Sequence, residues 1–248
     1  MTDALGWRMK YGVIAPSTNT VVQPEFDMMR PRGVTNHFAR IHIPNDPLRS
    51  DADFERLIET VDRELLAAVD RVMTCEPGHL IMGMSSETFW GGLDGSERLR
   101  ERIEARAGVG VTMGSDASRQ ALRRYGDIRR IAVVTPYMPV ADQQVHRFFS
   151  DCGFEVVRLI GLRCPSLVLI AHVGQRELRD AILAVDGPDV EAIVQVGTNL
   201  AMAQLAAAAE TWLGKPVLAI NTATYWWALR CNGIAEPIDG FGRLLHEF

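Results

Sequence analysis

The sequence has no apolar run of the roughly 20 residues that a membrane-spanning helix needs. Its first ten residues, MTDALGWRMK, lack the apolar core of a signal peptide. We therefore expect a cytoplasmic protein with no membrane partner.

Cysteine is scarce, and no metal or nucleotide motif is present. The four cysteines, Cys75, Cys152, Cys164 and Cys231, lie far apart and form no CxxC pair, which argues against a disulfide framework or a zinc site. The six histidines lack the spacing of metal ligands. No GxGxxG or Walker motif follows an apolar run. We expect neither a metal nor a cofactor.

A basic patch is also missing. The formal net charge is −5, and lysine and arginine are scattered along the chain. Because nucleic-acid binding depends on gathered positive charge, we expect no nucleic-acid partner and a small-molecule function instead.

Short apolar runs alternate with longer segments of helical periodicity. We predict strands at residues 11–16, 36–43, 79–84, 109–114, 129–136, 154–162, 191–197 and 215–221. We predict helices at residues 53–73, 95–107, 116–126, 140–153, 175–185, 199–214 and 223–233. This alternation is typical of an α/β fold with doubly wound, Rossmann-like parallel sheets.

The order of these signals repeats along the chain. YGVIAPSTNT resembles RRIAVVTPYMPV, HLIMGMSSETFWGG resembles EAIVQVGTNLAMAQ, and VTMGSDASRQAL resembles VLAINTATYWWAL. Three matched pairs in the same order predict two pseudo-symmetric α/β domains, at residues 1–125 and 126–248. We expect the last segment to cross back to the first domain.

Four polar loops follow predicted strands, at residues 15–20, 84–88, 135–140 and 197–200. Parallel sheets bind ligands beyond the carboxyl ends of their strands. If the two domains face one another, the four loops share one cleft between them.

The loops carry donors suited to an anion. PSTNT, with Ser17 and Asn19, could hold a carboxylate, although a proline turn followed by a helix cap explains the pattern equally well. SSE, residues 85–87, could form an anion site at a helix N-terminus. A capping serine followed by a solvated Glu87 is the interpretation that we favour for that glutamate. VGTNL adds Gly197, Thr198 and Asn199, and Tyr137 could donate from its phenol.

Several longer stretches carry a resemblance to a known family. GVIAPSTNT, IMGMSSETFWGG, VVTPYMPVADQQVHRFFSDCGFEV and the segment from VGTNLAMAQ to WWALRCNGI resemble the maleate cis-trans isomerase and arylmalonate decarboxylase family of the aspartate/glutamate racemase superfamily. The resemblance implies two similar α/β domains, no cofactor, and a small carboxylic acid bound between the domains.

The resemblance also implies which residues hold the substrate. Family members use a cysteine in one or both of two facing loops, and those positions match Met84 and Gly197 here. Asn19 and Tyr137 match substrate-holding residues, and an asparagine expected elsewhere falls near Leu167. The matched substrate-binding positions are Ser85, Ser86, Thr198 and Asn199.

We therefore expect a cofactor-independent enzyme that binds a small carboxylate and works without cysteine, most simply a decarboxylase or another lyase. Ser85, Ser86 and Tyr137 are the catalytic candidates. The binding candidates are Ser17, Asn19, Met84, Glu87, Gly197, Thr198 and Asn199. Three alternatives stay open: an isomerase or racemase with a non-cysteine mechanism, a hydrolase, and a non-catalytic carboxylate-binding protein. For this fold we expect a homodimer.

Overall fold

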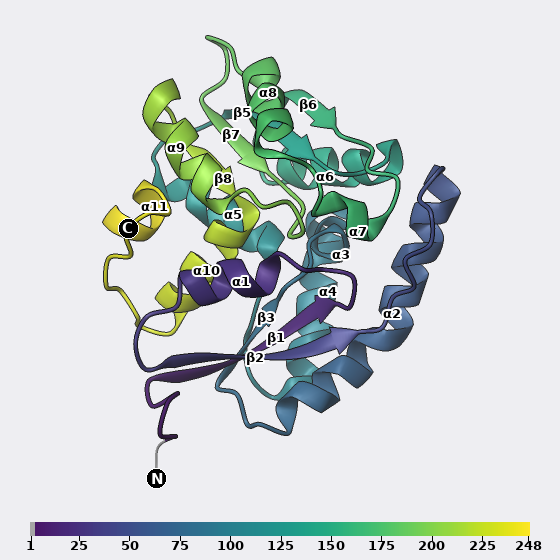
Figure 1. Cartoon of the computed structure of the whole chain (residues 1–248), viewed down its shortest axis with the longest axis vertical. Coiled ribbons are helices and arrows are strands. Elements are labelled where there is room, and N and C mark those ends of the chain that lie inside the picture. The colour runs from purple at the N-terminus through teal and green to yellow at the C-terminus, as the bar shows by residue number, and fades with distance from the viewer. Residues whose placement is uncertain (1–2) are drawn as a thin grey trace.

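Two parallel four-stranded sheets form the framework of the molecule, for which a computed structural model describes residues 3–248 (Figure 1). The first sheet has the order β2-β1-β3-β4 and the second the order β6-β5-β7-β8. The strands are β1 (Met9–Pro16), β2 (Val34–Ile41), β3 (His79–Met82), β4 (Val111–Thr112), β5 (Arg130–Thr135), β6 (Glu155–Gly161), β7 (Ala192–Gln195) and β8 (Val217–Ala219). The shared order confirms the predicted pair of similar α/β domains.

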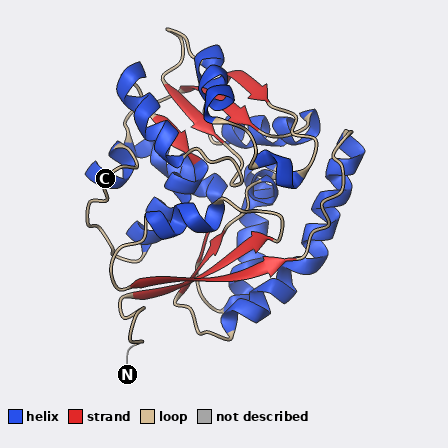
Figure 2. Cartoon of the chain, in the orientation of Figure 1, coloured by secondary structure: helices blue, strands red, loops and turns tan. Residues whose placement is uncertain are grey.

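Helices cover both sheets, as Figure 2 shows. The longer ones, close to the predicted ranges, are α2 (Asp51–Met73), α4 (Gly92–Ala107), α5 (Gly114–Arg124), α6 (Pro139–Asp151), α8 (Gln175–Val185), α9 (Ala203–Leu213) and α10 (Ile220–Cys231). Four short ones were not predicted: α1 (Val22–Met28), α3 (Ser86–Phe89), α7 (Leu167–Ile170) and α11 (Arg243–Glu247). One or two helical turns are too short to show a periodic pattern. Among residues 3–248, no helix combines the length and apolar character needed to cross a membrane.

The central strands are apolar because helices cover them on both faces. Every residue of β3 and β7 is buried. Of the edge strands, β2 and β6 are largely half-buried, whereas the short strands β4 and β8 are buried. Each sheet therefore meets solvent mainly at one of its two edges.

Helix α10 lies against the first half of the molecule. It packs on α5 and α1, and the Tyr11 hydroxyl of β1 donates a hydrogen bond of 2.8 Å to the Ala228 carbonyl. Trp226 of this helix is buried. The exact boundary between residues 125 and 126 stays a prediction.

Candidate active site between the two sheets

One cavity gathers all four predicted loops. Its residues follow β1, β3, β5 and β7, and four apolar side chains close it. The lining is Pro16, Thr18, Asn19, Ile43, Leu57, Met84, Ser85, Ser86, Glu87, Pro136, Tyr137, Leu167, Ile170, Gly197, Thr198 and Asn199. The free volume is about 50 Å³, room for a few water molecules.

A larger outer pocket of about 460 Å³ adjoins the cavity. Three apolar side chains line both spaces: Ile43, Leu57 and Leu167. The wall between the two spaces is therefore apolar.

Three polar groups form the centre of the cavity wall. The hydroxyl oxygens of Ser85 and Tyr137 lie 2.6 Å apart, and the Thr198 backbone N–H donates to Ser85 Oγ at 3.2 Å. Burial raises the pKa of Tyr137, and the hydrogen bond with Ser85 opposes this effect. Tyr137 therefore keeps its proton at neutral pH and can donate to an anion.

Asn19 joins the two halves at the cavity. Its Oδ1 accepts hydrogen bonds from the backbone N–H groups of Val21 and Val22, each at 3.0 Å, at the start of α1. Its Nδ2 donates to Thr198 Oγ1 at 3.0 Å. A side-chain amide has two N–H donors, so one stays available to a ligand. Both interpretations of PSTNT, a helix-start turn and a ligand donor, fit this geometry.

Asn199 is held more tightly. Its Oδ1 accepts from the Thr20 backbone N–H at 3.0 Å, and its Nδ2 donates to the Leu167 carbonyl at 2.9 Å. The side chain fastens loops of both halves to one another.

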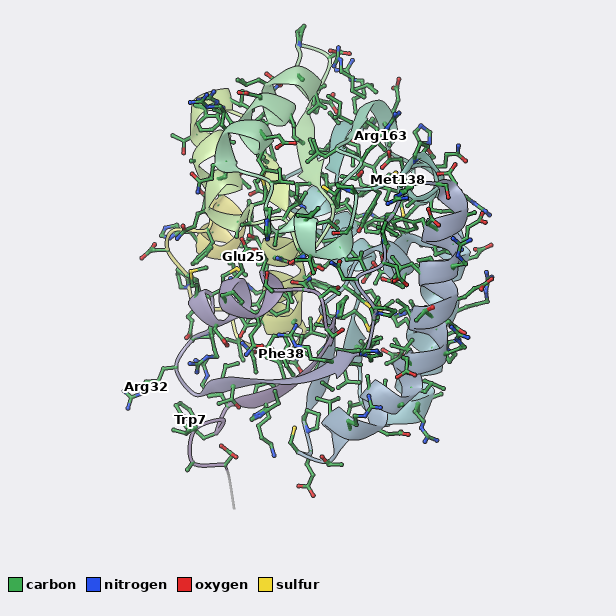
Figure 3. All side chains as sticks on the ribbon, turned by 45° about the vertical axis from the view of Figure 1, so that its right-hand side comes forward. Trp7, Glu25, Arg32, Phe38, Met138 and Arg163 are labelled. Carbon is green, nitrogen blue, oxygen red and sulfur yellow. The ribbon has the colours of Figure 1, made fainter. Side chains whose placement is uncertain are left out.

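The buried carboxylate of Glu25 supports the loop at residues 197–200 through Asn221. Glu25 Oε1 accepts from the Ala203 backbone N–H at 3.0 Å, and Oε2 accepts from Asn221 Nδ2 at 2.6 Å. Asn221 Nδ2 also donates to the Thr198 carbonyl at 3.0 Å. Figure 3 shows Glu25 on α1, where that helix meets the second half. Glu25 was not predicted as a site residue from the sequence; its position between the apolar residues Val22 and Phe26 was the available signal.

Tyr137 is positioned from behind by a short polar chain. Its backbone N–H donates to Thr135 Oγ1 at 3.1 Å, and the Thr135 hydroxyl donates to the Asp142 carboxylate. Burial raises the pKa of Asp142 to about 6, against the opposing hydrogen bond from Thr135. This chain fixes the loop that presents the phenol to the cavity.

Met84 and Gly197 occupy the positions that the resemblance matches to cysteines. Met84 is 2% exposed and lines the cavity. Gly197 has a φ of +112°, and a Cβ added there would lie 2.6 Å from Pro136 Cδ. The local backbone therefore excludes a larger side chain at residue 197 unless Pro136 moves.

The four cysteines all fall within the described part of the chain, and none of them lines the cavity. Cys164 contacts a residue of the cavity lining, since its backbone N–H donates to the Pro136 carbonyl at 2.9 Å. Burial raises the pKa of its thiol to about 11, so it is protonated at neutral pH.

One expectation about an individual side chain is wrong, and another stays a prediction. Ser17, a binding candidate, is exposed and is not part of the cavity lining; its Oγ accepts from the Ile43 backbone N–H at 3.0 Å. Glu87 is not solvated: it is 9% exposed and lines the cavity, because α3 packs it inward. Ser85 occupies the N-cap position of α3, but its side chain makes no capping hydrogen bond. Its hydroxyl is committed to Tyr137 and Thr198 instead.

Positive side chains are missing from the cavity lining within residues 3–248. Arg40 lies behind the first loop, where its Nη1 donates to the Asn19 carbonyl at 2.9 Å and to the Pro16 carbonyl at 3.2 Å. A bound carboxylate would therefore depend on neutral donors and backbone N–H groups, which can hold an anion when they converge.

The family model described as arylmalonate decarboxylase matches residues 12–245. The maleate isomerase of Pseudomonas putida strain KT2440 is 25% identical over 251 residues, which cover 95% of this chain and 96% of that protein. The arylmalonate decarboxylase of Bordetella bronchiseptica is 26% identical over 170 residues, covering 67% of this chain and 70% of that protein.

Solved structures show the same fold. A cysteine-to-serine mutant of the Nocardia farcinica maleate cis-trans isomerase, with a covalently bound succinylcysteine intermediate, superposes with a TM-score of 0.87 at 20% identity. The match covers 96% of this chain and 98% of that one. A crystal structure of arylmalonate decarboxylase gives a TM-score of 0.74 at 21% identity and covers 95% and 98% of the two chains.

Proposed function

Because the chain belongs to the arylmalonate decarboxylase family, we propose that it is a cofactor-independent enzyme that decarboxylates a small carboxylic acid, or cleaves it as another kind of lyase. The observation that carries the proposal is the cavity itself. It sets neutral hydrogen-bond donors opposite apolar side chains, and no thiol lines it among the described residues.

Ser85, Ser86 and Tyr137 are the proposed catalytic residues. One substrate carboxylate accepts hydrogen bonds from these hydroxyls, and it becomes an enediolate when the neighbouring carbon loses CO₂. Preorganised donors aimed at developing negative charge are usually the largest single contribution to such a rate. The binding site is also shaped by Asn19 of the loop at residues 15–20 and by three residues of the facing loop, Gly197, Thr198 and Asn199.

The apolar part of the lining has a complementary role. Met84, Ile43 and Leu57 surround the remaining space with side chains that offer no hydrogen bonds. A carboxylate held against them is poorly solvated, which favours its departure as neutral CO₂.

Two alternatives remain as proposals of lower rank. The maleate isomerase relatives favour an isomerase, which would here need a mechanism without cysteine. The absence of both matched cysteines favours a protein that binds a carboxylate without turning it over. The donor cluster around Ser85 is compatible with either alternative.

A substrate panel tests the proposal. Purified protein is incubated with malonates, maleate, amino acids and their amides, and products are followed by NMR and by release of CO₂. Loss of CO₂ from a malonate supports the decarboxylase, and formation of fumarate from maleate supports the isomerase. Binding without turnover of any compound supports the carboxylate-binding protein.

The homodimer and the cytoplasmic location are further proposals. Light scattering on the purified protein tests the first, and fractionation of expressing cells tests the second.

A further inference from the structure

Glu87 separates the cavity from a second pocket. That pocket holds about 430 Å³ between α2, α3 and α4. It is lined by Ile58, Val61, Asp62, Leu65, Glu87, Trp90, Gly91, Gly95, Arg98, Leu99 and Arg102. Glu87 lines this pocket and also the cavity with the Ser85–Tyr137 pair.

The carboxyl group of Glu87 has few of the contacts that would hold a charge: hydrogen bonds from its own backbone N–H and from the Ser86 hydroxyl only partly oppose the effect of its burial. Its Oε2 is buried and has no hydrogen-bond partner among the described residues. Much of the second pocket beside it is apolar, with Ile58, Leu65 and Trp90. A carboxyl group in such surroundings favours its neutral form, and burial raises the pKa of Glu87 accordingly.

We propose that Glu87 is the proton donor of this site, carrying a proton into the cavity and recovering one from water in the second pocket. The inference rests on the proposed lyase function. It gives the site the acid that the missing thiols would otherwise supply.

The step balances as follows. The bond between the substrate carbon and the departing carboxylate breaks, and its electron pair forms the enediolate. Protonated Glu87 then gives its proton to that carbon, directly or through the hydroxyls of Tyr137 and Ser85, and becomes a carboxylate. A proton from solvent restores the acid, so that the net reaction consumes one proton and releases one CO₂.

The other groups beside Glu87 are consistent with this cycle. In the described chain, the remaining titratable or charged groups that line the two spaces are Tyr137, Asp62, Arg98 and Arg102. Arg102 is paired with Asp62 at 2.5 Å. Tyr137 itself holds its proton too firmly to be the source, since burial raises its pKa.

Three variants test the role. Glu87→Gln keeps the shape of the side chain and cannot donate the carboxyl proton. Glu87→Leu removes a buried carboxyl group whose Oε2 has no hydrogen-bond partner among the described residues, so this variant should be at least as stable as the wild type. Glu97→Gln, at an exposed position on α4, is the matched control.

The expected kinetic result is a loss of kcat of about 100-fold or more in both Glu87 variants, with KM changed little, as for removal of a general acid. The acid must be protonated to act, so the wild-type rate falls as pH rises through its pKa. That limb should be absent in Glu87→Gln and unchanged in Glu97→Gln. A Glu87→Gln enzyme with the wild-type rate and pH profile would overturn the proposal.

Infrared spectroscopy of the ligand-free protein supplies a readout that needs no substrate. Burial also raises the pKa of Glu25, so the band of Glu87 is taken from the difference between wild type and variant. The spectra of wild type minus Glu87→Gln and minus Glu87→Leu should both show the carbonyl band of a protonated carboxyl group at neutral pH. Difference spectra without the band overturn the proposal. If no compound of the panel is turned over, the proposed function fails, and the band alone decides whether Glu87 carries a proton.

Discussion

At the scale of single residues, the Ser85–Tyr137 pair is the centre of the proposed site. The two oxygens lie 2.6 Å apart, and a backbone N–H fixes Ser85 from the second half. The bond between the two hydroxyls uses one of their two protons, so the pair can present one hydroxyl donor to a carboxylate oxygen without reorganisation. Both side chains are already buried and oriented for this.

Removal of either hydroxyl should slow turnover strongly. Ser85→Ala and Tyr137→Phe should each lower kcat by about 100-fold, as for loss of one oxyanion donor. Steady-state kinetics on the best compound of the panel measure the effect. Ser17→Ala, which alters an exposed hydroxyl outside the cavity, is the control. Turnover unaffected by both substitutions would refute the assigned roles.

A thiol should be tolerated at only one of the two matched positions. Met84→Cys shortens a buried side chain, and we expect it to lower the free energy of unfolding by ~1–3 kcal/mol. Gly197→Cys places a Cβ 2.6 Å from Pro136 Cδ at a positive φ, and we expect a loss of more than ~3 kcal/mol.

Urea denaturation compares these variants. Gly174→Cys is the matched control, because no atom lies within 4 Å of its added Cβ and its φ of −77° is ordinary. A Gly197→Cys protein as stable as Gly174→Cys would show that the backbone at residue 197 adapts freely.

The sequence allowed prediction of which side chains would gather, where they follow strand ends. One cavity is lined by Asn19, Met84, Ser85, Tyr137 and Thr198, because strand ends in a parallel sheet meet at one edge. Their roles stay predictions. The orientations of Ser17 and Glu87 could not be predicted, since they depend on local turns. No periodic pattern shows that Ser17 turns to Ile43 or that α3 directs Glu87 inward.

At the scale of elements, the long helices and all eight strands could be predicted, and the short helices could not. Helix α1 shows the limit: its seven residues are held by Glu25, whose partners lie on α9 and α10. Contacts between residues so distant in the chain leave no trace in local propensity. The predicted strand at residues 215–221 also runs too far, since Ile220 and Asn221 begin α10.

The start of α6 should give the protein a measurable pH dependence. Burial raises the pKa of Asp142 to about 6. Because this folded-state pKa exceeds the unfolded value, the folded state binds the proton more tightly. Stability from Asp142 is therefore fully present below about pH 4 and is lost as pH rises to about 6. The whole loss amounts to at most ~3 kcal/mol.

Thermal unfolding of Asp142→Asn between pH 4 and 7 checks this prediction. The midpoint temperature of unfolding of the variant should increase relative to that of the wild type as pH rises, since asparagine does not ionise and can still accept from Thr135. Asp180→Asn, an exposed substitution on α8, should show no such trend. A difference independent of pH would refute the role of Asp142.

At the scale of the whole molecule, the site exists only because two sheets with the same strand order face one another through the carboxyl ends of their strands. Asn19 with Thr198 and Asn199 with Thr20 are the hydrogen-bonded pairs that fasten the facing loops. The repeat in the sequence predicted this arrangement. The packing of α10 against α5 and β1 adds a further link between the halves.

Loss of the Asn199 amide should loosen this junction. Asn199→Ala leaves the Leu167 carbonyl and the Thr20 N–H without their partner, and we expect a loss of ~1–3 kcal/mol in the free energy of unfolding. Asn232→Ala removes an amide that donates to the Ala228 carbonyl within its own helix end, and it should cost less. Equal losses would indicate that Asn199 has no special part in joining the halves.

The central claim is that this fold supports chemistry on a carboxylate without a thiol. A variant with alanine in place of Cys75, Cys152, Cys164 and Cys231 tests it most directly, with folding verified by circular dichroism and turnover of the malonate panel measured by CO₂ release. We predict wild-type kcat and KM within about two-fold, because none of these described side chains lines the cavity. A folded variant that has lost the activity of the wild type would contradict the account.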